Sequence, residues 1–185
     1  MESNTEKIIE VFVELRFSGD NPRPLAVVGL GDALAGKEIA PRLEQVEEEC
    51  ALTIKQSKSI LEQAGHRNSN PLVRWEIGDL VLKFLEKQRE HGFVILNHVE
   101  TFAKGLGLAK SYLEAILRFR ERYPDKSGIW KDIGWGKYYE LVWFNDPTIM
   151  KKIEEQVRTG GLLSKGIQEI RKKANKGSWK PPEPR

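Results

Sequence analysis

Residues 99–118, VETFAKGLGLAKSYLEAILR, have the residue spacing of a helix-turn-helix. In that motif the first helix needs a small residue where the second helix crosses close by, and Ala103 occupies this position. The turn four positions later needs a residue that tolerates a positive φ angle, and Gly107 stands there. The remaining inward positions all hold apolar residues: Phe102, Leu106, Leu108, Leu113 and Ile116. The stretch therefore predicts two helices joined by a tight turn, within about residues 95–123.

The solvent side of the predicted second helix carries small and polar residues that fit a DNA groove. They are Ala109, Lys110, Ser111, Glu114, Ala115 and Arg118. A second interpretation stays open, because an ordinary helical hairpin in an all-α domain gives a similar pattern of apolar and polar residues.

Composition places the chain among globular proteins. Of its 185 residues, 39% are hydrophobic and 31% are charged. No apolar run approaches the ~20 residues that a membrane-spanning helix needs, and the acidic N-terminus lacks the apolar segment of a signal peptide. We therefore expect a cytoplasmic protein with no membrane partner. The lone Cys50 excludes an internal disulfide and a thiolate metal cluster, so we expect no metal site and no other cofactor.

The overall charge of +3 is unevenly distributed along the chain. Residues 1–50 carry a net charge of −6, whereas residues 51–150 carry +3 and residues 151–185 carry +6. A basic half is expected where a protein meets phosphate groups, although lysine-rich helix surfaces are also common in other soluble proteins.

The first forty residues are predicted to form an acidic N-terminal helix and a linker. Apolar and acidic residues in 5–17 give the two sides of a short helix. In 25–36, LAVVGLGDALAG resembles a strand leading into a glycine turn, but the third glycine of a dinucleotide fingerprint is missing and no βαβ unit follows. A short helix or an edge strand is the better interpretation of this segment.

Helical periodicity dominates residues 41–174, the predicted DNA-binding domain. A long helix is expected from Pro41 to about residue 64, with Cys50 buried on its apolar stripe. Further helices are expected over about 71–89, 136–144 and 147–159, and Asn145 or Asp146 should cap the last of these. Trp75 lies off the stripe of its helix, which indicates packing against another element.

A second, weaker helix-turn-helix is predicted around residues 157–172. Val157 takes the position of the small residue and Gly161 that of the turn, and valine fits a close crossing less well than alanine. Its exposed side would carry Ser164, Lys165, Gln168, Glu169 and Lys172. Residues 175–185, which include Lys176 and Trp179, are expected to be a basic flexible tail.

A resemblance to a known family runs through these helices. Trp75-Glu76-Ile77-Gly78 comes first, Tyr123-Pro124 follows, and Trp135-Gly136-Lys137-Tyr138 precedes Asp146. Over about residues 42–173 this order resembles the N-terminal helix-turn-helix domain of the YhcG-type family of PD-(D/E)xK nucleases. Lys137 stands where that family usually has histidine. The last part also resembles, more weakly, the helical DNA-binding region of ParB-like partition proteins.

The resemblance does not bring the nuclease activity with it. Pro124-Asp125 supplies the first half of the nuclease signature, yet no Asp or Glu in the sequence has Lys two residues after it. Such an enzyme needs carboxylates for Mg²⁺ and a nearby lysine. HExxH, GxSxG and P-loop motifs are also absent from the sequence, and we therefore predict no enzymatic activity.

The sequence thus predicts an all-α domain of about seven to nine helices, with one well-matched and one weaker helix-turn-helix. We expect a non-catalytic protein that binds double-stranded DNA through residues 99–118. The expected DNA contacts are Lys110, Ser111, Glu114, Arg118, Lys165, Gln168, Lys172 and Lys176. The alternative is a protein-interaction subunit of a nucleic-acid-processing complex, in which the helix-turn-helix is scaffold and the 41–64 helix is a candidate homodimer contact.

Overall fold

The computed structural model of the chain describes residues 11–17, 24–28, 39–65 and 69–178. This part of the chain is predominantly helical, as predicted, and it also contains a small sheet. The helices are α1 (Ile39–Ala64), α2 (Pro71–Glu90), α3 (His98–Leu106), α4 (Lys110–Arg122), η2 (Lys126–Gly128, a 3₁₀ turn), α5 (Trp135–Leu141), α6 (Pro147–Arg158) and α7 (Ser164–Ala174). The strands are β1 (Val11–Phe17), β2 (Pro24–Val28) and β3 (Phe93–Ile95).

The N-terminal helix prediction is wrong wherever the structure tests it, because residues 11–17 form strand β1. Val13 and Leu15 are buried while Phe12 is 39% exposed, so the side chains alternate between core and solvent with a period of two. The segment VFVELRF is rich in β-branched and aromatic residues, which favour this conformation. Residues 5–10, where the expected helix would begin, lie outside the described residues.

The sheet has the strand order β2-β1-β3. β1 pairs antiparallel with β2, from Val13 opposite Val28 to Phe17 opposite Pro24, and parallel with β3, from Val11 opposite Phe93 to Val13 opposite Ile95. The interpretation of residues 25–36 as an edge strand is therefore confirmed for β2, and residues 29–36 lie outside the described part. β3 was not predicted from the sequence, so α3 begins at His98 rather than near residue 95.

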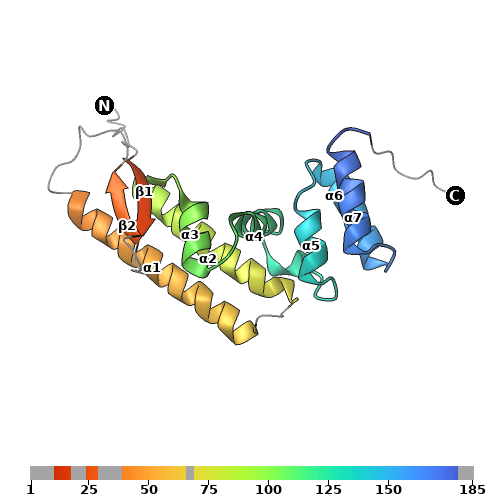
Figure 1. Cartoon of the computed structure of the whole chain (residues 1–185), viewed down its shortest axis with the longest axis horizontal. Helices are drawn as coiled ribbons and strands as arrows, with labels where there is room; N and C mark the ends of the chain where they lie inside the picture. The colour runs from red at the N-terminus through yellow and green to blue at the C-terminus, as the bar shows by residue number, and fades with distance from the viewer. Residues whose placement is uncertain (1–10, 18–23, 29–38, 66–68, 179–185) are drawn as a thin grey trace, which may run out of the picture. The chain divides into compact units, whose positions relative to one another are not determined.

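The chain forms two compact units (Figure 1). Unit 1 comprises residues 1–60 and 79–113, and unit 2 comprises residues 61–78 and 114–185. The sheet and α3 belong to unit 1, whereas α5, α6 and α7 belong to unit 2. The chain passes between the units within helices α1, α2 and α4.

The core of unit 1 joins the sheet to helical side chains. Val13, Cys50 and Phe102 are fully buried, and burial raises the pKa of the Cys50 thiol to about 12. The predicted place of Cys50 on the apolar stripe of α1 is confirmed. Glu49 accepts hydrogen bonds from Lys87 and Gln88 at 2.7 Å each, so this carboxylate holds α1 to α2.

The core of unit 2 is a cluster of aromatic rings. The ring of Phe119 lies 4.9 Å from those of Tyr123 and Tyr138 and 5.4 Å from that of Trp135, measured between centroids. The Trp75 indole N–H donates to the carbonyl oxygen of Tyr123 at 2.7 Å, which confirms that Trp75 packs against another element. These contacts join α2, α4 and α5 within the unit.

Gly78 allows α2 to pass close to α4. A Cβ atom on Gly78 would lie 2.8 Å from the Cβ atom of Arg120 and 3.0 Å from the carbonyl oxygen of Ile116. Larger side chains do not fit this space, which gives the glycine of the Trp-Glu-Ile-Gly segment a structural role.

Candidate nucleic-acid interface

The turn between α3 and α4 has the predicted geometry. It consists of residues 107–109, and Gly107 adopts the left-handed conformation with φ +68° and ψ 30°. The Leu108 N–H donates to the carbonyl oxygen of Ala103 at 2.9 Å, which closes the end of α3. The backbone thus reverses in three residues and α4 starts at Lys110.

Five of the inward residues expected around this turn are confirmed as buried, whereas Leu108 is half-buried. Phe102, Leu113 and Ile116 are 0% exposed, and Ala103 and Leu106 are 3% and 7% exposed. The prediction that Ala115 faces solvent is wrong, since it is also 0% exposed. Leu117 and Phe119 are buried as well, so α4 has core neighbours on most of its circumference, which a single amphipathic stripe does not reveal.

The solvent-facing part of α4 is a narrow polar strip. Lys110, Ser111 and Arg118 are exposed, and Glu114 is half-buried. Lys110 and Ser111 belong to unit 1, and Glu114 and Arg118 belong to unit 2. Unit 1 therefore offers a cationic and a hydroxyl group in the first turn of α4, and unit 2 offers the guanidinium of Arg118.

Arg118 is held in place by an aromatic ring. Its Cζ atom lies 4.6 Å from the centroid of the Trp143 ring, which is within the range of a cation–π interaction. Stacking occupies a face of the guanidinium and leaves its in-plane N–H groups available for an anion. Nearby, burial lowers the pKa of Arg122, and the positive charge of Arg118 adds to this effect.

The second predicted helix-turn-helix departs from its expected geometry. α6 and α7 are joined by five residues, 159–163, and the left-handed glycine is Gly160 with φ +83° rather than Gly161. The expected cap of α6 is confirmed, since the Asp146 carboxylate accepts from the backbone N–H of Thr148 at 2.7 Å. The sequence offers two consecutive glycines at 160 and 161, and the first of them adopts the positive φ angle.

The predicted contacts of the C-terminal region lie along α7. Lys165 and Lys172 are exposed, Gln168 is half-buried, and Lys176 follows the helix on the surface. The opposite side of α7 is anchored within unit 2: Arg171 forms an ion pair with Glu140 at 3.1 Å, and the Asn175 amide donates to the Trp143 carbonyl oxygen at 2.9 Å. The tail beyond residue 178, including Trp179, lies outside the described residues.

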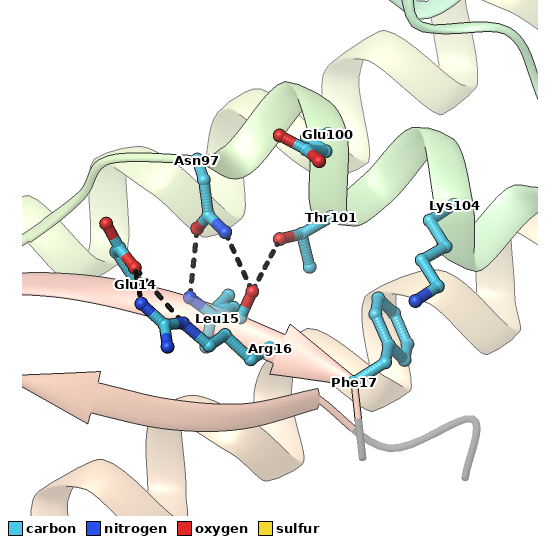
Figure 2. Close-up of a pocket in the computed structure, with 8 residues that line it drawn as sticks. All are labelled: Glu14, Leu15, Arg16, Phe17, Asn97, Glu100, Thr101 and Lys104. Carbon is cyan, nitrogen blue, oxygen red and sulfur yellow. Dashed lines mark hydrogen bonds and ion pairs between the residues drawn. The ribbon is translucent and has the colours of Figure 1, made fainter. Parts of the chain in front are cut away.

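A cavity of about 430 Å³ in unit 1 lies beside α3 and the end of β1. Here side chains form hydrogen bonds with the backbone of β1. Figure 2 shows Asn97 bonded to both backbone groups of Leu15: its Oδ1 accepts the N–H at 2.9 Å and its Nδ2 donates to the carbonyl oxygen at 2.8 Å. Thr101 donates to the same carbonyl oxygen at 3.1 Å. Asn97 therefore continues the pairing of β1 where β3 has ended, and it fixes the start of α3.

The other residues around this cavity carry balanced charge. Arg16 pairs with Glu14 at 2.7 Å, and the Lys104 ammonium lies 5.2 Å from the centroid of the Phe17 ring, while Glu100 stands on α3 (Figure 2). Two carboxylates and two cations leave no net charge, so the cavity favours neither an anion nor a cation. Sequence reasoning missed Asn97, because its partner lies 82 residues away.

No grouping of three or more His, Cys, Asp or Glu side chains suited to a metal ion occurs in the part of the chain that the structure describes. Within the same residues, none of the helices is long and apolar enough to span a bilayer. Comparisons with protein-family models, with curated proteins and with solved structures found no match.

Proposed function

We propose that this protein binds double-stranded DNA without catalysis, with the first turn of α4 in the major groove. One observation carries the proposal: the three-residue turn at Gly107 presents Lys110 and Ser111 to solvent directly beside the fully buried Leu113. N-terminal residues of a recognition helix reach base edges, whereas later residues tend to meet the backbone. Lys110 and Ser111 would therefore read bases, and Glu114 would lie behind them.

We assign the phosphate contacts to cations farther along α4 and on α7. Arg118 is exposed and oriented by Trp143, which suits a bond to a phosphate oxygen. Lys165, Lys172 and Lys176, with the polar Gln168 between them, give the exposed side of α7 its positive charge. This division separates sequence reading from charge-dependent affinity, and the two respond differently to salt.

The experiment compares three single variants on a selected duplex site and on random duplex DNA over a salt series. Lys110→Ala and Ser111→Ala should change the preferred sequence, at a cost of about 1–3 kcal/mol for a good base contact. Arg118→Ala should weaken all sequences alike and reduce the magnitude of the log–log salt slope by about 1. Lys131→Ala, which removes an exposed cation outside the proposed interface, is the matched control. The proposal fails if all three variants bind both DNAs like the wild type.

A protein-interaction role is the second candidate function, and exposed apolar residues in unit 1 favour it. Leu52 on α1 is 54% exposed, Leu96 is 52% exposed and Phe12 is 39% exposed. Singly exposed apolar side chains are normal, but a contiguous patch of them would mark a protein contact. Sedimentation of the wild type and of Leu52→Glu tests the predicted homodimer through α1: the wild type should sediment as a dimer and the variant as a monomer. A monomeric wild type would contradict this role for α1.

A further inference from the structure

A second cavity, of about 360 Å³, lies in unit 2 between the end of α4, η2 and α6. Its size falls within the range of small-molecule sites in proteins. The side chains that give it chemical character are Tyr123, Trp130, Lys151, Glu154, Glu155 and Arg158. None of them belongs to the proposed DNA-reading strip.

The inner end of this cavity holds a carboxyl group beside two phenols. Burial raises the pKa of Glu154, and the hydroxyl groups of Tyr123 and Tyr138 act in the opposite direction. Tyr138 Oη already accepts the backbone N–H of Trp130 at 2.8 Å. The Tyr123 residue is 7% exposed, and its Oη atom is buried without a hydrogen-bond partner of good geometry among the described residues. The Tyr123 hydroxyl nevertheless interacts with the Glu154 carboxyl, so a ligand that binds this carboxyl also meets a buried hydroxyl.

The outer end of the cavity combines an aromatic surface with cations. Trp130 is 43% exposed, and the Arg158 guanidinium stacks on its ring with Cζ 3.3 Å from the centroid. Stacking leaves the in-plane N–H groups of Arg158 available. Lys151 adds an exposed ammonium two turns earlier on α6, on the other side of Glu154. A third cation, Arg122, is partly engaged, because it donates to the Phe144 carbonyl oxygen and to the Met150 sulfur.

A ligand for this cavity therefore needs N–H donors at one end and negative charge at the other. A purely cationic ligand is disfavoured because Arg122, Lys151 and Arg158 would repel it, and a simple anion is disfavoured because Asp125, Glu154 and Glu155 would do the same. A nucleotide with an amino-bearing base satisfies both ends. The base edge presents N–H groups, the base plane stacks on aromatic rings, and the phosphate carries the charge.

We propose that this cavity binds a guanine nucleotide unit, with the base edge donating to Glu154, the base plane against the stacked pair of Trp130 and Arg158, and the phosphate at Lys151. Guanine fits best among the bases because its ring N–H and its amino group lie side by side, so that one carboxylate can accept from both. The Tyr123 hydroxyl supplies the remaining hydrogen bond. The nucleotide comes either free or as a unit of single-stranded nucleic acid, and the two sources share this chemistry.

Isothermal titration of the full chain with guanosine 5′-monophosphate tests the proposal, with uridine 5′-monophosphate for comparison. We expect the guanine nucleotide to bind at least about tenfold more tightly, since uracil lacks the paired N–H groups. Titration with short oligo-dG and oligo-dT separates the sources: tighter binding of oligo-dG than of the mononucleotide assigns the site to single strands, and equal or weaker binding assigns it to free nucleotide.

Two carboxylates of unit 2 provide the matched variants. Glu154→Gln should lose about tenfold or more in guanine nucleotide affinity, whereas Glu169→Gln, with the same charge change at an exposed position on α7 outside the cavity, should bind like the wild type. Tyr123→Phe removes only the buried hydroxyl and should weaken binding severalfold. Circular dichroism checks that each variant is folded at the titration temperature. If Glu154→Gln is unfolded, Tyr123→Phe still tests the site.

Three results would overturn the inference: no binding of the guanine nucleotide by the wild type, equal binding of the guanine and uracil nucleotides, or equal losses in Glu154→Gln and Glu169→Gln. The test is separable from the proposed duplex binding. Lys110→Ala should retain nucleotide binding in full, and failure of the wild type to bind duplex DNA would leave the nucleotide result unchanged.

Discussion

The α3–α4 pair and the α6–α7 pair begin from the same local signal and end in different roles. Each pair has a left-handed glycine after its first helix, Gly107 with φ +68° and Gly160 with φ +83°. The first pair reverses in three residues and the second in five. The second helices differ most: α4 buries side chains on most of its circumference, whereas Ile167 is the buried residue of α7.

This difference shows that a turn motif determines a local reversal of the backbone. It does not determine how deeply the side chains of the following helix are buried. α4 belongs to the core, so its outer strip is narrow and its first turn carries most of the chemistry available to a partner. α7 packs against α5 along one side and leaves its lysines in solvent. The four predictions below test this contrast, beginning with the largest effect.

Truncation of a buried aromatic side chain of α4 should cost the most stability. Phe119→Ala removes a ring that is 0% exposed and contacts three other rings, so we expect a loss of about 3–5 kcal/mol in urea unfolding. Leu163→Ala, in the turn before α7, changes a side chain that is 77% exposed and should stay within about 0.5 kcal/mol of the wild type. Similar losses in the two variants would contradict the contrast between the pairs.

The two left-handed glycines should respond alike, although the helices after them differ. Gly107→Val and Gly160→Val each place a β-branched residue at positive φ and should cost about 1–3 kcal/mol through backbone strain. Gly136→Ala in α5 is the control: its Cβ would lie 3.7 Å from Ser164 Oγ, and we expect a gain of about 0.4–1 kcal/mol. Thermal unfolding measures all three, and normal stability in Gly107→Val would count against the strained turn.

The attachment of α7 should depend on one ion pair. Glu140→Gln removes the charged partner of Arg171, whose side chain is 22% exposed, and we expect a loss of about 1 kcal/mol. Glu169→Gln, at an exposed position on α7, should change stability by less than about 0.5 kcal/mol. Amide hydrogen exchange in α7 should rise in Glu140→Gln alone, and unchanged protection there would show that the ion pair does not hold the helix.

The smallest effect should be a pH dependence carried by α6. Because burial raises the pKa of Glu154 above that of the unfolded chain, its protonated form favours the folded state. The stability associated with this group is present below the ordinary glutamate pKa and is lost as the pH rises through the folded value. Glu154→Gln should therefore match the wild type near pH 4 and exceed it modestly at neutral pH in urea unfolding. A difference that is constant with pH would contradict this assignment.

Local sequence determined much of the helical part of this protein. The long periodic stripes of α1 and α2, the proline and Asp146 at the start of α6, and the glycine at position 107 all act within a few residues, so they could be predicted from the sequence. The same local signals placed Lys110, Ser111 and Arg118 on the surface correctly.

Tertiary structure decided what distant contacts control. Strand β1 exists because β2 and β3 pair with it, and Asn97 completes that pairing from 82 residues away, so a helical pattern in residues 5–17 was misleading. Ala115 is buried because α4 has neighbours on several sides, and hydrophobic periodicity in the sequence does not reveal how many sides of a helix are covered. The cavity around Tyr123 and Glu154 joins α4 to α6, and no motif marks it. Sequence by itself thus determined the elements whose hydrogen bonds close within one or two turns, whereas only the tertiary structure decided the strand pairing, the depth of each helix and the polar groups brought together in unit 2.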